Sequence, residues 1–298
     1  MIQRIQPIAA RFVGILLIAS AAGTACGSGS DDAAPIADDP VAGSAEPETV
    51  STTTSTTTSI PAGGRQPAAD DPLRVLFAGD SLAIETAAPT MAALRGGGSA
   101  GASFVGAPVI PRGPLGRLFW SNTLDESDPD VVVLLIGVWE RMGFKQARSA
   151  GQTLSQYRAE VIDPFVDLVT SRGAELVWVS SPVVREPVAS SELSFMNEIF
   201  EGVSQIDDRV TYIDANRRIT GPTGEYVEIA TGPDGSAQRL RRQDGTHLCP
   251  DGAVRMAEPV IGYVADRWNV PVDQNWPEGA WRTADPFEAA PAECPAPG

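Results

Sequence analysis

The sequence is poor in histidine, cysteine and basic side chains. It has one histidine and three cysteines in 298 residues, and 22 Lys and Arg stand against 38 Asp and Glu, a formal net charge of −16. So few cations argue against nucleic acid as a partner, because phosphate backbones are bound by Lys and Arg. They also argue against adsorption to an anionic membrane. We expect no metal and no cofactor, since these His and Cys cannot build a zinc site and no G-x-G-x-x-G follows the first strand.

The N-terminus has the features of an export signal over residues 1–25. Arg4 and Arg11 form a positive region before an apolar run over 12–22, and this run is shorter than the ~20 residues needed to span a bilayer. The residues before Cys26 resemble a bacterial lipoprotein processing site, although Gly23 stands where an aliphatic residue is usual. We therefore predict export, with a lipid on Cys26 that anchors the protein to the outer side of the membrane. Plain secretion is the alternative.

The rest of the chain divides by composition into three parts. Residues 26–71 are rich in Gly, Ser, Asp, Pro and Thr, cannot bury a core, and are predicted to be a disordered linker. Residues 72–270 are predicted to fold, and 271–298 form an irregular tail rich in Pro and Trp. Once Cys26 is set aside, Cys249 and Cys294 are an even pair in an oxidising compartment, which favours a disulfide. The alternative is that both are incidental small residues.

The folded part alternates short apolar runs with amphipathic stretches. This pattern is typical of an α/β fold with a mainly parallel sheet in a three-layer α/β/α sandwich. The run over 130–137 is continuous enough to be buried on both faces. The expected strands are 73–79, 102–106, 130–137, 174–182 and 209–216, and the expected helices are 82–96, 153–173, 190–205 and 252–268.

Three residues are predicted to carry chemistry. Ser81 follows the strand over 73–79, at the edge where open α/β sheets bind ligands. His247 is the only histidine, and histidine is the commonest general base near neutral pH. Asp244 lies three residues before it, close enough to orient the imidazole. Nucleophile, base and orienting carboxylate make a Ser-His-Asp triad. The alternative is a turn at Ser81 and a surface histidine.

Two motifs resemble a known family. FAGDSLA over 77–83 resembles the first conserved block of the SGNH (GDSL) hydrolases, and DGTHLCPDG over 244–252 resembles the last. The resemblance implies a flavodoxin-like sheet order. It also implies Ser81 as nucleophile, His247 as base and Asp244 as the residue that orients it.

The middle blocks of that family supply the oxyanion hole, and here the sequence departs. The N–H of Ser81 is one expected donor. A second is the N–H of Gly113, with Gly116 and Gly106 as alternatives. The family's third block is Gly-x-Asn-Asp, but Trp139 stands in place of the Asn donor. Its indole either replaces that donor in part, binds a sugar ring, or packs beneath the sheet edge.

Two acidic residues and a basic cluster complete the expectations. Asp80 and Glu140 are grouped with Trp139 as substrate-binding residues, and Glu140 is also expected to pair with Arg141. The basic cluster over 239–245 is expected to be a solvated loop or a site for an acidic glycan. The sequence thus predicts an exported esterase or O-acyltransferase, acting on acyl groups of an envelope glycan or lipid. A catalytically silent glycan-binding or scaffold protein is the alternative, and the oligomeric state is open.

Overall fold

The computed structural model describes residues 67–107, 109–288 and 290–297. The predicted signal peptide, the predicted lipidation site at Cys26 and nearly all of the predicted linker lie outside these residues. Within the described residues, no helix is both long and apolar enough to cross a membrane.

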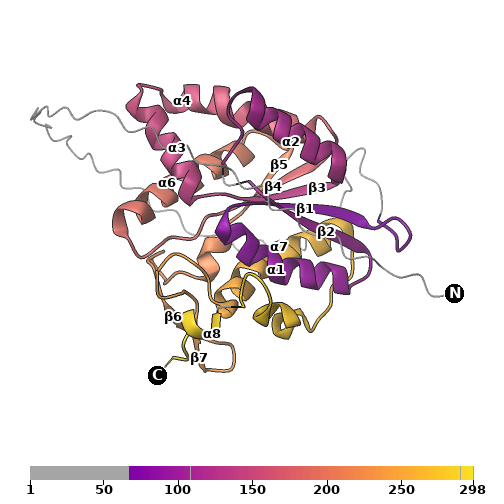
Figure 1. Cartoon of the computed structure of the whole chain (residues 1–298), viewed down its shortest axis with the longest axis vertical. Helices are drawn as coiled ribbons and strands as arrows, with labels where there is room; N and C mark the ends of the chain where they lie inside the picture. Colours follow the sequence, from indigo (N-terminus) through magenta and orange to yellow (C-terminus); the bar gives the residue numbers. More distant parts are fainter. Residues whose placement is uncertain (1–66, 108, 289, 298) are drawn as a thin grey trace, which may run out of the picture. The chain divides into compact units, whose positions relative to one another are not determined.

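A five-stranded sheet forms the middle of the fold (Figure 1). Its order is β2-β1-β3-β4-β5, and all four pairings are parallel. The central strands are buried on both faces, as the continuous apolar run at β3 predicted. The strands are β1 (Leu73–Gly79), β2 (Ala100–Gly106), β3 (Val131–Leu135), β4 (Glu175–Val179) and β5 (Val210–Ile213).

Helices cover both faces of this sheet, which confirms the predicted α/β fold with a mainly parallel sheet. Side chains at alternate strand positions point to opposite faces and form two apolar cores. One core lies beneath α1 (Ser81–Gly96) and α7 (Pro250–Trp268). The other lies beneath five helices: α2 (Gly113–Ser127), α3 (Val138–Ser149), α4 (Leu154–Tyr157) with its π-helical continuation Arg158–Ile162, α5 (Asp163–Thr170) and α6 (Pro187–Ser204).

Some elements differ from the sequence expectations. The helices α2 and α3 (Val138–Ser149) occupy stretches where motif residues alone were expected. Leu115 and Leu118 of α2 are exposed while Trp120 and Leu124 are buried, so its apolar residues do not lie on one face. A hairpin of β6 (Ile229–Thr231) and β7 (Ala237–Arg239) precedes α7.

The C-terminal residues pack on the first core. They form 3₁₀ helices at Trp276–Glu278 and Ala280–Thr283 and the four-residue helix α8 (Ala290–Glu293). Trp281 and Phe287 belong to the core beneath α1 and α7. Another 3₁₀ helix, Ala215–Arg218, follows β5.

Candidate active site

Ser81 is the first residue of α1, two residues beyond the end of β1. Gly79 makes this turn with φ of +150°, and a Cβ there would overlap the carbonyl oxygen of Leu135. Asp80 caps the helix, because its Oδ1 accepts a hydrogen bond from the N–H of Leu82 at 3.0 Å. The sequence Gly-Asp-Ser therefore ends a strand, caps a helix and presents a hydroxyl at the carboxyl edge of the sheet.

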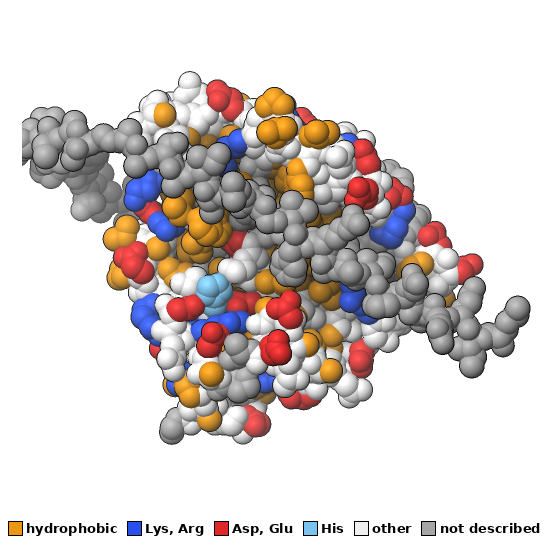
Figure 2. Space-filling model, in the orientation of Figure 1, with side chains coloured by type: hydrophobic (Ala, Val, Ile, Leu, Met, Phe, Trp, Pro, Cys, Tyr) orange, Lys and Arg blue, Asp and Glu red, His pale blue; other side chains and the backbone are white. Residues whose placement is uncertain are grey.

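The structure brings Ser81, His247 and Asp244 together. The Nε2 atom of His247 lies 2.9 Å from Oγ of Ser81, and its Nδ1 lies 2.6 Å from Oδ2 of Asp244. Burial opposes ionisation of Asp244, but hydrogen bonds from the His247 ring and from two backbone N–H groups outweigh it and lower its pKa. The histidine, pale blue in Figure 2, is at the surface, with acidic side chains beside it and hydrophobic side chains gathered above it.

A buried carboxylate holds the segment that carries the histidine. We call residues 240–249, between β7 and α7, the histidine loop. Glu85, one turn beyond Ser81 on α1, accepts the N–H of Leu248 at 2.8 Å and pairs with Arg242 at 2.7 Å. Only 2% of Glu85 is exposed, and burial raises its pKa to about 7 despite the guanidinium. No motif in the sequence singles out Glu85; its only signal is an acidic residue four positions after Ser81 in an Ala-rich helix.

The basic cluster over 239–245 is neither a solvated loop nor an open anion site. Arg241 is fully buried, donates to the carbonyls of Val183 at 2.7 Å and Thr246 at 3.1 Å, and burial lowers its pKa to about 10. Arg242 donates to the carbonyls of Leu248 and Pro286. These arginines are internal supports of the histidine loop, so the sequence interpretation was wrong.

A second buried carboxylate holds residues 109–112, which lead into α2 and which we call the β2–α2 loop. Glu140, near the start of α3, has no exposed surface and accepts the N–H of Ile110 at 2.9 Å and Arg112 at 2.6 Å. It also accepts the hydroxyl of Tyr157. The expected pairing with Arg141 is wrong, and a carboxylate with these partners does not face substrate. Its place is beneath the loop that leads to Gly113.

Asp80 is turned inward as well. Its Oδ2 accepts the N–H of Gly137 at 3.3 Å, and burial raises its pKa to about 6. A Cβ on Gly137 would overlap the side chain of Ser181, so this close approach requires glycine. Asp80 therefore joins α1 to the β3–α3 connection, and the expectation that it binds substrate is not supported by this geometry.

The other predicted residues have these places. Gly113 is the first residue of α2, with φ of +70°, while Gly106 ends β2 opposite Gly79 and Gly116 packs on Pro111 within α2. Trp139 is the second residue of α3, and 48% of its surface is exposed. It therefore does not pack beneath the sheet edge, and its two other predicted roles stay predictions.

The predicted disulfide between Cys249 and Cys294 is confirmed, with a Cα–Cα distance of 5.8 Å. It joins the end of the histidine loop to the C-terminal residues. Arg242 makes the same connection through an ion pair with Glu293.

Three solved structures are similar to this one over about two thirds of this chain. The structure resembles the crystal structure of TesA with a TM-score of 0.42 and 14% identity, over 65% of this chain and 98% of that one. It resembles an acetyl esterase mutant with acetate ion (TM-score 0.39, 12% identity, 66% of this chain and 97% of that one). It also resembles the salicylyl-acyltransferase SsfX3 from a tetracycline biosynthetic pathway (TM-score 0.38, 18% identity, 68% of this chain and 57% of that one).

The strand order 2-1-3-4-5 and the places of the two motifs match what the resemblance to SGNH hydrolases implies. The fold itself is α/β, with a parallel five-stranded sheet between helices. Residues 119–263 match the family model described as "Protein of unknown function (DUF459)", a little under half of the chain. No curated protein matches the sequence. These likenesses do not specify the chemistry, which depends on the side chains at the site.

Proposed function

We propose that this protein is a serine esterase or O-acyltransferase. The observation that carries the proposal is the chain of contacts from Asp244 through His247 to the Ser81 hydroxyl, at 2.6 and 2.9 Å. This is the arrangement that activates a serine, because the histidine accepts the hydroxyl proton and the carboxylate stabilises the imidazolium.

The reaction would proceed in two halves. The Ser81 oxygen attacks the ester carbonyl as His247 takes its proton, and the resulting oxyanion is held by N–H groups at the start of α1 and by that of Gly113. The C–O bond to the leaving alkoxide breaks as His247 returns the proton to it. Water or an acceptor hydroxyl then attacks the acyl-enzyme, with His247 again moving the proton, and Ser81 is released.

The substrate we propose is an acylated carbohydrate or lipid ester of a cell envelope. The predicted lipid at Cys26 would place the folded part on the outer side of a membrane, within reach of such esters. Detergent partitioning and intact mass of the exported protein test this placement, since a Cys26→Ser variant should lose the lipid mass and move to the aqueous phase. Equal partitioning of both proteins would reject the anchor.

Covalent labelling with a fluorophosphonate probe tests the chemistry. The wild-type protein should be labelled at Ser81, while Ser81→Ala and His247→Ala should lose labelling although their circular dichroism is unchanged. A folded wild-type protein that resists the probe would contradict the proposal.

A second function, glycan binding without catalysis, is favoured by one observation. Trp139 stands where the resemblance expects the Asn donor, and its ring is half-exposed at the start of α3. Exposed aromatic rings bind sugars, and removal of one oxyanion donor lowers kcat by about 10²–10³. Binding of envelope glycan that persists in Ser81→Ala but is lost in Trp139→Ala, without probe labelling of the wild type, would favour this second function.

A further inference from the structure

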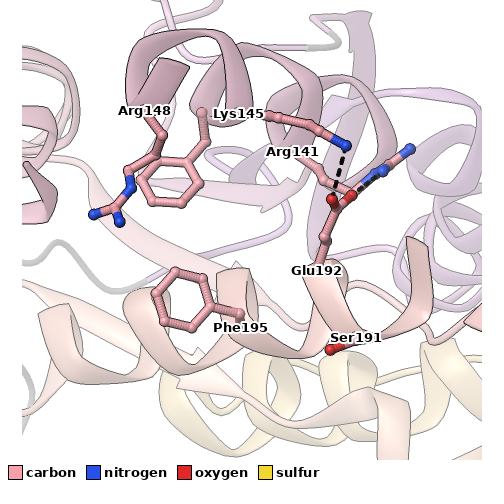
Figure 3. A pocket seen from close by; sticks show the side chains of 7 residues that line it. Arg141, Lys145, Arg148, Ser191, Glu192 and Phe195 are labelled. Carbon is pink, nitrogen blue, oxygen red and sulfur yellow. Dashed lines mark hydrogen bonds and ion pairs between the residues drawn. The ribbon is translucent and has the colours of Figure 1, made fainter. Parts of the chain in front are cut away.

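A cavity of about 380 Å³ lies between α3 and α6, outside the triad (Figure 3). Side chains of α3 form one wall and side chains of α6 the other. The lining residues are Arg141, Phe144, Lys145, Arg148, Ser191, Glu192 and Phe195.

The walls of this cavity carry an excess of positive charge. Three cations face one carboxylate, in a chain whose formal net charge is −16. Glu192 pairs with both Arg141 and Lys145, the second at 3.1 Å. Among the ion pairs of the described residues, none involves Arg148, and its guanidinium points away from Glu192 (Figure 3). Arg148 is thus an exposed cation over an open cavity.

Two aromatic rings supply an apolar surface in the same place. The ring centroids of Phe144 and Phe195 are 5.8 Å apart, inclined at 39°. Phe144 is buried and contributes to the core, whereas Phe195 has 42% of its surface exposed. The Nε of Arg141 is buried, and within the described part of the chain it has no hydrogen-bond acceptor.

Both walls begin at the edge of the sheet that carries the triad. α3 starts directly after Gly137, whose N–H is bound by Asp80 beside Ser81. Just before α6, Arg185 is tied to the histidine loop, through its N–H to Gly245 at 2.9 Å and its side chain to Gln243 at 2.7 Å. The cavity therefore lies between two helices whose N-terminal ends are at the active-site edge.

We propose that this cavity binds an organic anion with an apolar body. The acidic head would accept hydrogen bonds from Arg148, and the apolar body would lie against Phe195, with Lys145 on the cavity wall. Charge-assisted hydrogen bonds and aromatic surface in one cavity select such a ligand over a neutral sugar, which would leave the free guanidinium unused.

Binding is tested in the folded Ser81→Ala protein, so that the result does not depend on the proposed catalysis. Isothermal titration with octanoate and with octyl phosphate, each below its micelle concentration, distinguishes a carboxylate head from a phosphate head. Octyl glucoside is the neutral probe with the same chain. Arg148→Gln and Phe195→Ala should each weaken anion binding about tenfold, the loss expected for one charge-assisted hydrogen bond or one apolar contact. Arg117→Gln, an exposed arginine of α2, is the matched control and should bind as the parent does.

Lys145 gives an independent readout, because it is the only lysine in the sequence. An amine-reactive reagent should modify it more slowly when octanoate or octyl phosphate is bound, as measured by peptide mass spectrometry. Tight binding of either anion with protection of Lys145 supports the proposal. Equal affinity for octyl glucoside, unprotected Lys145, or full affinity in Arg148→Gln would overturn it.

Discussion

On each side of the active-site edge a buried glutamate holds a loop, but the two loops differ in the other contacts that hold them. On one side Glu85 of α1 accepts a backbone N–H of the histidine loop and pairs with Arg242 of that loop. On the other side Glu140 of α3 accepts a backbone N–H of the β2–α2 loop and binds Arg112 of that loop. In each case a buried helical glutamate fixes a loop that the sequence left without regular structure.

The difference lies in what else holds each loop. The histidine loop is also joined to the C-terminal residues by the Cys249–Cys294 disulfide and by Arg242 with Glu293. The β2–α2 loop has the hydroxyl of Tyr157 as a further partner of its glutamate. The loop that carries the base is thus held redundantly, whereas the loop that leads to Gly113 depends more on one carboxylate.

The largest expected effect concerns the chemistry on the histidine side. Asp244→Asn should lower kcat for ester hydrolysis by about 10³–10⁴, because the amide cannot hold the same histidine tautomer or stabilise the imidazolium. The melting temperature should change little, since Asp244 is half-exposed at 48%. Steady-state kinetics with a short p-nitrophenyl ester measure the rate. Asp234→Asn, in the turn between β6 and β7, is the matched control and should keep the parent's kcat. An unchanged kcat in Asp244→Asn would contradict the proposed triad.

The next effect tests the dependence of the β2–α2 loop on Glu140. Glu140→Ala leaves Arg112, the N–H of Ile110 and the Tyr157 hydroxyl without their common acceptor, which should lower the free energy of unfolding by about 3–5 kcal/mol. Urea unfolding measures this loss. At temperatures where the variant is folded, kcat should fall more than KM rises, because a misplaced oxyanion donor acts in the transition state.

The control for that prediction is a glutamate in an exposed pair. Glu258→Ala on α7 removes only an ion pair with Arg218, and such pairs are worth about 0–1 kcal/mol. Equal losses of unfolding free energy in the two variants would show that Glu140 stabilises the protein no more than an exposed glutamate does.

The sequence predicted the residues of the triad, but it did not predict the buried residues that hold the loops in place. The contact of Ser81 with His247 joins residues 166 positions apart, and it was predicted because each end lies in a recognisable short motif. The contact of Glu85 with Leu248 spans 163 positions, and it was missed because neither residue belongs to a motif that names its partner. Burial of a charge is decided by packing between distant segments, so composition alone makes a glutamate look solvated.

The elements of the fold were likewise predicted where the sequence has a clear local pattern and missed where it has none. Apolar runs predicted the five strands, most clearly the inner strands β1, β3 and β4, because parallel strands buried on both faces read as continuous hydrophobic stretches. The helix α2 was missed because it begins with Gly113 and Pro114 and exposes three of its large apolar residues, Leu115, Leu118 and Phe119. Its sequence therefore lacks the one-sided periodicity by which a helix is predicted.

A smaller effect is expected from removing the redundant hold on the histidine loop. The double variant Cys249→Ser, Cys294→Ser should lose about 2–4 kcal/mol of unfolding free energy, since the bridge closes a loop with a sequence separation of 45. Its kcat should stay within about twofold of the parent at 25 °C, because Glu85 and Arg242 still hold the loop. Calorimetry and ester kinetics measure the two quantities. Loss of kcat in the folded double variant would show that the disulfide, and not the buried ion pair, sets the position of His247.

The smallest effect concerns the pH at which Glu85 supports the histidine loop. Burial raises its pKa to about 7, so between its ordinary value and about 7 the folded protein keeps a proton that the unfolded chain releases. The folded state binds more protons in that window, and stability should therefore fall as pH rises through it.

Glu85→Gln removes this titration while keeping an oxygen for the N–H of Leu248. The fall in unfolding free energy between pH 4.5 and 7 should become shallower, by at most roughly 3 kcal/mol over the window at ~1.4 kcal/mol per pH unit. Asp80, whose raised pKa of about 6 acts in the same direction, is present in both proteins and cancels in the difference. Urea unfolding at half-unit pH steps measures the slopes. Identical slopes would mean that Glu85 is charged throughout, and that the histidine loop rests on a full ion pair with Arg242.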